Sequence, residues 1–169
     1  MASPRVLDDV LGALSRSGLD PARLQLEITE SVLMEHHESS ATVLSTLRSM
    51  GVTIAIDDFG TGYSSLAYLE RLPVDIIKID KAFVDRIDDG GRHAKLIKGI
   101  LSLTHDLGLT AVAEGIETVN QLDALEALSC PSGQGYLFSR PIDADSLRTY
   151  VHERTTSRSH DPLGLRSVV

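Results

Sequence analysis

The chain of 169 residues has one cysteine, Cys130, and lacks any long apolar run. A lone cysteine excludes a disulfide framework. A membrane-spanning helix needs roughly 18 consecutive apolar residues, and no run in the sequence approaches that length. The first residues, "MASPRVLDDV", also lack the basic segment followed by an apolar segment that is typical of a secretory signal. We therefore expect a protein of the reducing cytoplasm.

Positive charge is scarce as well. The chain contains 16 Lys and Arg against 24 Asp and Glu, which gives a net charge of -8. Polymeric nucleic acid and anionic membranes carry negative charge themselves, so neither is an expected partner. A small anionic substrate is compatible with this composition if metal ions neutralise it. Hydrophobic residues make up 42% of the chain, which is enough for one core and favours a single soluble domain.

Helical and strand periodicities alternate along the sequence. Apolar residues at helical spacing predict helices at about 6–14, 40–50, 92–107, 119–128 and 144–152. Short apolar runs predict strands at 24–28, 52–56, 74–80, 109–114 and 135–138. Residues 153–169 show little periodicity and many turn-forming residues, so a domain over 1–152 and a mobile tail are expected. Five strands alternating with helices predict parallel pairing, in an open α/β sheet or a barrel.

The positions of the polar residues favour the barrel. In a (β/α)₈ barrel the functional groups gather at the C-terminal ends of the strands. Every predicted strand has polar side chains near one of its ends, and for all but the last this is the C-terminal end. In chain order they are Glu27 and Glu30, Asp57 and Asp58, Lys78 and Asp80, Glu114 and Glu117, and Gln134 immediately before the last strand. The sequence thus predicts an incomplete TIM-like barrel with its site at one mouth.

Several carboxylates converging on one mouth would repel each other unless cations lay among them. Hard oxygen ligands suit Mg²⁺ or Mn²⁺, so a metal cluster is predicted. Two such ions can activate water and stabilise an in-line displacement at phosphorus, with Lys78 as a fixed positive charge nearby. Structural roles remain open for single residues: Asp57 and Asp58 as turn and cap residues, and Lys78 with Asp80 as a buried ion pair.

The segment "GTGYSSL" follows the two aspartates. It is no dinucleotide fingerprint, because Ser65 occupies the place of the third glycine. We interpret it as a mobile loop hinged at its two glycines, with hydroxyl side chains that could bind ligand or the neighbouring strands; an ordinary surface loop is the alternative. The candidate loop residues are Gly60, Thr61, Gly62, Tyr63 and Ser64.

Five segments, in order, resemble one known family. "LEITES", "DDFGTGYSSL", "IKID", "AEGIET" and "QGYLFSRP" are similar to motifs of the EAL-domain family of bacterial cyclic di-GMP phosphodiesterases, over residues 6–151. The resemblance implies a TIM-like barrel with one reversed strand. It also implies hydrolysis of one phosphodiester of cyclic di-GMP to the linear dinucleotide with two Mg²⁺ or Mn²⁺ ions.

The resemblance also implies roles for single residues. Glu27, Asp57 and Glu114 resemble metal ligands, and Asp58 resembles a ligand of the second metal. Lys78 is similar to the residue that orients the attacking water, and Asp80 to a second-metal or water-holding group. Glu30 resembles the anchor of the glycine-rich loop, and Gln134 resembles a contact to metal-bound water or substrate. Glu117 resembles a supporting acid.

Two features of the family do not occur in this chain. No Glu-Ala-Leu signature with the family's metal-binding glutamate precedes "LEITES", because the Glu-Ala-Leu tripeptide at 126–128 lies within the helix predicted at 119–128. The asparagine ligand expected before the first helix is absent as well. Three barrel strands are absent with them, which leaves two expectations. In the first, the chain is the C-terminal portion of a phosphodiesterase, active only when a longer chain or a partner supplies the first strands. In the second, it is a non-catalytic module that binds cyclic di-GMP or protein, or a truncated product whose open sheet edges drive self-association.

Overall fold

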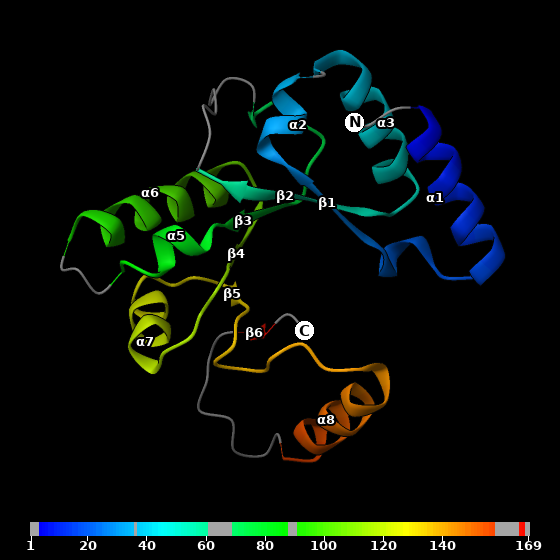
Figure 1. Ribbon diagram of the computed structural model, residues 1–169. Helices are drawn as coiled ribbons and strands as arrows, with labels where there is room; N and C mark the ends of the chain where they lie inside the picture. Colours follow the sequence, from blue (N-terminus) through cyan, green and yellow to red (C-terminus); the bar gives the residue numbers. More distant parts are fainter. Residues whose placement is uncertain (1–3, 36, 61–68, 88–90, 158–165, 168–169) are drawn as a thin grey trace.

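The computed structural model describes residues 4–35, 37–60, 69–87, 91–157 and 166–167 (Figure 1). Its centre is one sheet in which every neighbouring pair of strands is parallel and the strand order follows the chain. The strands are β1 (Gln25–Thr29), β2 (Thr53–Phe59), β3 (Ile76–Ile79), β4 (Thr110–Ala113), β5 (Ser132–Gly133) and β6 (Arg166–Ser167). Within the described residues the sheet is open, with β1 at one edge and β6 at the other.

Helices lie in the connections between the strands, as parallel pairing favours, except between β2 and β3, where residues 61–68 lie outside the described ranges. They are α1 (Pro4–Ser17), α2 (Glu30–Glu35), α3 (His37–Ser49), α5 (Lys81–Val84), α6 (Arg92–Asp106), α7 (Val119–Ala127) and α8 (Ala144–Ser157), with a 3₁₀ turn at Pro21–Arg23. Helix α8 stands apart from the sheet in Figure 1. No helix in the described ranges has both the length and the apolar character that a membrane span requires.

The two faces of the sheet differ in chemistry. On one face Ile54, Ile56 and Ile77 pack with buried residues of α2 and α3, and Ile79 packs with buried residues of α6 and α7. Side chains alternate along a strand, so the positions between them face the other way. That opposite face carries the predicted polar residues, among them Glu27, Asp57, Lys78 and Glu114. The hydrophobic core therefore lies between sheet and helices, and the candidate site lies across the sheet from it.

One predicted strand is wrong. Residues 135–138 were expected to form the last strand, but residues 136–138 form a turn and the strand is Ser132–Gly133. The apolar side chains of Leu137 and Phe138 pack against the core cluster of α6 and α7 without sheet pairing. A short apolar run does not reveal by itself which structure buries it. Gln134 consequently follows the strand β5 directly, whereas the expectation placed it immediately before a strand at 135–138.

Three helices also differ from the expectation. Helices α2 and α5 were not among the predicted helices, and α8 continues to Ser157, beyond the predicted boundary at residue 152. Two residues of the predicted tail, Arg166–Ser167, pair with β5 as β6. The division of the chain at residue 152 into a domain and a mobile tail stays a prediction.

Candidate metal centre

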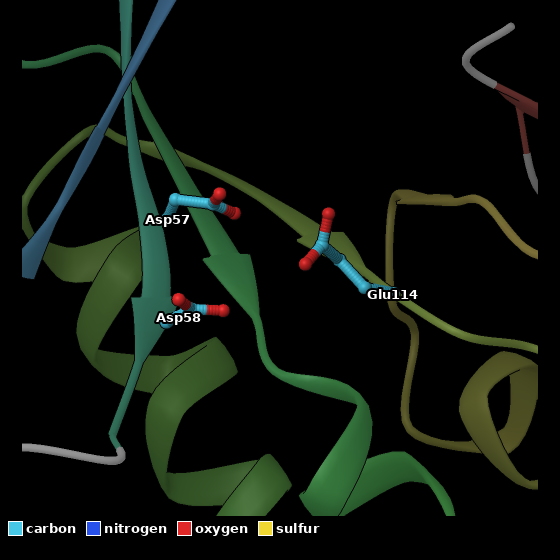
Figure 2. A group of neighbouring side chains, drawn as sticks. All are labelled: Asp57, Asp58 and Glu114. Atoms are coloured by element: carbon cyan, nitrogen blue, oxygen red, sulfur yellow. The ribbon is translucent and has the colours of Figure 1, made fainter.

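Three carboxylates converge at the C-terminal ends of the strands. Asp57 and Asp58 belong to the end of β2, and Glu114 follows β4 directly. Each offers a carboxylate oxygen, and these oxygens all lie within 4.8 Å of one another. Figure 2 shows the three side chains directed into the same space between the strands. A set of closely spaced carboxylate oxygens fits a hard divalent cation such as Mg²⁺ or Mn²⁺.

Asp58 joins this group because the strand is irregular. Strict alternation would turn Asp57 and Asp58 to opposite faces of the sheet. The pairing of β2 with β3 shifts register between Ile56 and Phe59, and Asp58 has a φ of 54°. This is the behaviour of a β-bulge, which inserts one residue and redirects a side chain. Both aspartates therefore point toward Glu114 (Figure 2).

Lys78 of β3 lies among the carboxylates. Its Nζ is 2.6 Å from Glu27 Oε2, 2.8 Å from Asp57 Oδ1 and 2.7 Å from Glu114 Oε1. The lysine side chain is only 6% exposed. Burial alone would lower the pKa of Lys78, but hydrogen bonds to Asp57, Glu114 and Glu27 outweigh it and raise the pKa above the ordinary value. Lys78 is thus a fixed positive charge at the centre of the site.

The alternative pairing of Lys78 with Asp80 does not match these ion pairs. Asp80 lies just beyond the end of β3, and its Oδ1 accepts a hydrogen bond of 2.9 Å from Ala82 N as the N-cap of α5. It also affects Asp58: burial raises the pKa of Asp58, and Asp57 and Asp80 raise it further. Asp80 therefore borders the candidate metal-binding carboxylates and stabilises a helix start at the same time.

Gln134 and Glu114 are held together directly. Gln134 Nε2 donates a hydrogen bond of 2.7 Å to Glu114 Oε1. Burial raises the pKa of Glu114, and so do Asp57 and Glu27, while Lys78 opposes the shift. The raised pKa values of Glu114 and Asp58 reflect first the burial of these carboxylates and then the cost of gathering negative charge in one place. A divalent cation bound to these oxygens would relieve it, so the residues present fit such an ion.

The loops that carry Glu114 and Gln134 are tied to each other by their backbones. Ile116 N donates to Gln134 O at 3.1 Å, and Leu137 N donates to Ile116 O at 2.9 Å. Gly135 lies against the backbone of Ile116, where an added Cβ would be 2.7 Å from the Ile116 carbonyl carbon. This close approach fixes the Gln134 side chain beside Glu114.

Glu30 contacts the start of the glycine-rich segment. It is 3% exposed, and its Oε2 accepts a hydrogen bond of 3.1 Å from Gly60 N. Gly60 has a φ of 97°, a conformation that favours glycine. The other candidate loop residues, Thr61, Gly62, Tyr63 and Ser64, lie outside the described residues.

Glu117 does not join the carboxylate cluster. Its side chain forms an ion pair with Lys81, whose aliphatic chain covers Gly115. Beside this pair lies a groove of about 640 Å³ that also borders Glu114 and Gln134. The ring of Tyr136 lies in the same groove with the guanidinium of Arg140 at 4.9 Å from its centroid. Sequence reasoning missed Lys81, Tyr136 and Arg140, although each adjoins a residue or motif that it singled out.

Comparison with protein families decides the relationship. The model of the EAL domain family matches residues 1–141. The chain belongs to the EAL domain family.

Among curated relatives, the bifunctional diguanylate cyclase/cyclic di-GMP phosphodiesterase MucR of Pseudomonas aeruginosa is 45% identical over 146 residues, which is 86% of this chain and 21% of MucR. The cyclic di-GMP phosphodiesterase NbdA of the same organism is 43% identical over 146 residues, covering 86% of the chain and 19% of NbdA. This EAL chain thus spans about a fifth of the length of these relatives.

Solved structures confirm the fold. The P. aeruginosa MucR phosphodiesterase in its c-di-GMP complex matches with a TM-score of 0.82 and 44% identity, over 86% of this chain and 59% of that one. The EAL domain of Mycobacterium smegmatis DcpA matches with a TM-score of 0.84 and 37% identity, over 90% of this chain and 69% of that chain. Klebsiella pneumoniae BlrP1, solved with manganese and cyclic di-GMP, matches with a TM-score of 0.76 and 36% identity, over 82% of this chain and 35% of that chain. The predicted family and its α/β, TIM-like architecture are correct.

Proposed function

We propose that this EAL chain is part of a metal-dependent phosphodiesterase that hydrolyses one phosphodiester of cyclic di-GMP to the linear dinucleotide. The observation that carries the proposal is that carboxylate oxygens of Asp57, Asp58 and Glu114 lie within 4.8 Å of one another. Lys78 forms ion pairs with two of these residues, Asp57 and Glu114. Relatives named as cyclic di-GMP phosphodiesterases support the choice of substrate.

The carboxylates of Glu27, Asp57, Asp58 and Glu114 would hold Mg²⁺ or Mn²⁺. When bound, such ions lower the pKa of a water molecule and neutralise charge on phosphoryl oxygens. Lys78 donates from a fixed, buried position, so it can orient the attacking water or stabilise the charge that develops at phosphorus without reorganisation. Gln134 fixes one oxygen of Glu114 by its hydrogen bond of 2.7 Å, and Asp80 would hold water or a second ion beside Asp58.

The groove beside Glu114 supports binding of the nucleotide. It adjoins the metal-binding carboxylate on one side and offers the ring of Tyr136 and the guanidinium of Arg140 on the other. Aromatic faces and guanidinium planes are surfaces on which bases stack. We assign Glu117 a supporting role through Lys81, and we propose that Glu30 anchors the glycine-rich loop at Gly60. Thr61, Gly62, Tyr63 and Ser64, outside the described residues, stay candidate contacts for the substrate.

The open edge of the sheet suggests a requirement for further strands. Within the described residues, β1 has a partner on one side only, β2. An unpaired strand edge is a template for pairing with another segment. We propose that an upstream segment, or self-association, covers this edge, and that the protein works in the cytoplasm.

A second candidate function is cyclic di-GMP binding without catalysis, or a protein-interaction role. It is favoured because the residues ahead of "LEITES" include neither the metal-binding glutamate of a Glu-Ala-Leu signature nor the asparagine ligand. A metal that lacks two ligands is poorly held, and displacement of about 1 Å can cost about a hundredfold in rate. This candidate predicts ligand binding with no turnover in any context.

The test follows product formation by chromatography. The 169 residues alone should give negligible conversion of cyclic di-GMP with Mg²⁺ or Mn²⁺. Addition of family N-terminal strands, by fusion or as a separate fragment, should restore conversion. Lys78→Ala should abolish it again, whereas Lys98→Ala, at an exposed position of α6, should not. Robust turnover by the chain alone would contradict the requirement for added strands. A folded fusion without activity would support the binding role.

A further inference from the structure

Lys78 contacts carboxylates from three different parts of the sheet. Glu27 belongs to β1, Asp57 to β2, and Glu114 follows β4, while Lys78 itself belongs to β3. The side chain of Lys78 is 6% exposed, whereas its three partners are 42%, 27% and 16% exposed. A single buried ammonium group thus links four neighbouring chain segments at the mouth of the sheet.

We propose that Lys78 is an internal counter-ion: it holds Glu27, Asp57 and Glu114 together in the metal-free protein and competes with divalent metal for them. The proposal rests on the proposed function only in that a divalent ion binds these carboxylates. It adds a role for Lys78 that is separate from any contact with water or substrate.

The stabilising half of this role follows from charge and burial. Without Lys78, the carboxylates of Glu27, Asp57 and Glu114 would face one another and Asp58 with no cation between them. Removing one partner of a buried ion pair leaves uncompensated charge, which is strongly destabilising. The ammonium group therefore has to be present for the strands to keep this arrangement when no metal is bound.

The competing half follows from shared ligands. Asp57 and Glu114 donate oxygens to the metal-binding group and also accept hydrogen bonds from Lys78. A metal ion that enters must share these carboxylates with the ammonium group or displace it, and two cations a few ångströms apart repel each other. Lys78 should therefore stabilise the metal-free fold and weaken metal binding at the same time. A lysine that acts only on water or substrate would do neither.

The first measurement is thermal unfolding in EDTA. Lys78→Met should lower the midpoint by about 10 °C, the scale expected when a buried ion pair of this kind loses one partner. Lys98→Met removes the same charge from an exposed position of α6 and serves as the matched control, with little change expected. Equal midpoints for the two variants would overturn the counter-ion role, whether or not the protein binds metal.

A second variant tests the sign of the interaction. Glu27→Gln breaks an ion pair in the wild-type background and should lower the midpoint in EDTA. In the Lys78→Met background the same change removes one of the mutually repelling carboxylates, so it should raise the midpoint. If Lys78→Met alone does not fold, the double variant should recover a cooperative transition. A Glu27→Gln change that destabilises both backgrounds, or a double variant that stays unfolded, would contradict the proposal.

Competition between Lys78 and metal is tested by measuring Mn²⁺ binding from the electron paramagnetic resonance signal of the free ion. Lys78→Met should bind Mn²⁺ about tenfold more tightly than the wild type, since repulsion between close cations is removed. Equal or weaker binding by the variant would overturn the competition. If no protein binds Mn²⁺, the metal-dependent function fails, while the unfolding series in EDTA still decides the counter-ion role.

Discussion

Replacing Gly135 with alanine tests how the loops that carry Glu114 and Gln134 are held together. A Cβ at this position would lie 2.7 Å from the carbonyl carbon of Ile116 and even closer to its backbone N and O. These are backbone atoms, so no side-chain rotation can make room. The loop of Gly135 must move away from Ile116, which stretches the hydrogen bonds of 3.1 Å from Ile116 N and 2.9 Å to Ile116 O.

The expected cost combines overpacking and lost hydrogen bonds. Overpacking costs about 1–3 kcal/mol, and each backbone hydrogen bond contributes about 1 kcal/mol, so Gly135→Ala should destabilise by about 3 kcal/mol. For a chain of this size, the unfolding midpoint should fall by about 6–12 °C. The increase in midpoint on adding Mn²⁺ should also shrink, because Gln134 no longer holds Glu114.

Gly99→Ala is the matched control. Gly99 lies in α6 and has no heavy atom within 4 Å of an added Cβ. Alanine is the better helix former by about 0.5–1 kcal/mol, so the midpoint should stay equal or rise. Both variants are compared by circular dichroism on heating. Midpoints for Gly135→Ala and Gly99→Ala that agree within about 2 °C would refute the close packing of Gly135 on Ile116.

Three further predictions follow from the site, the sheet edge and the last helix. Asp57→Asn keeps the shape of the side chain but removes a charged ligand, so the rise in unfolding midpoint with millimolar Mn²⁺ or Mg²⁺ should be largely lost; an unchanged rise would argue against Asp57 as a ligand. The 169 residues alone should self-associate in light scattering because the edge of β1 is unpaired in the described sheet, and a monodisperse monomer would contradict this. Asp143 Oδ1 caps α8 by accepting hydrogen bonds from Ser146 N and Asp145 N. The hydrogen bonds from Ser146 lower the pKa of Asp143, so the stability that this cap gives α8 is present above the ordinary carboxylate pKa and is lost as pH falls through the lowered value. Asp143→Ala should therefore speed hydrogen exchange in the first turn of α8 at neutral pH and have no effect at strongly acidic pH; an equal effect at both would contradict the cap.

The sequence was sufficient to predict most of the residues that gather at the candidate metal centre. Parallel strands have their C-terminal ends at one edge, and side chains two apart share a face, so Glu27, Asp57, Lys78 and Glu114 could be brought together on paper. These features depend on regular geometry, which is why they could be predicted without coordinates.

Irregular backbone is where sequence reasoning fell short. The bulge at Asp58 comes from a register shift between β2 and β3, which no local pattern encodes. Lys78 and Asp80 share a strand face by spacing, yet β3 ends at Ile79 and Asp80 becomes a helix cap. Gly115, with a φ of 69°, turns the chain so that Glu117 reaches Lys81 on α5. Each of these outcomes depends on contacts between distant segments.

The charge of the centre explains how an acidic protein could bind an anionic dinucleotide. Glu27, Asp57, Asp58 and Glu114 carry more negative charge than Lys78 compensates, so the metal-free site repels a phosphodiester. One divalent ion leaves the site still slightly negative, whereas the two ions of the proposed mechanism make it positive and attract the phosphate. Metal loading should therefore come before substrate binding. Lys78 stabilises the metal-free fold and weakens the binding of those ions. Lys78 therefore also raises the metal concentration at which the site can accept an anionic dinucleotide.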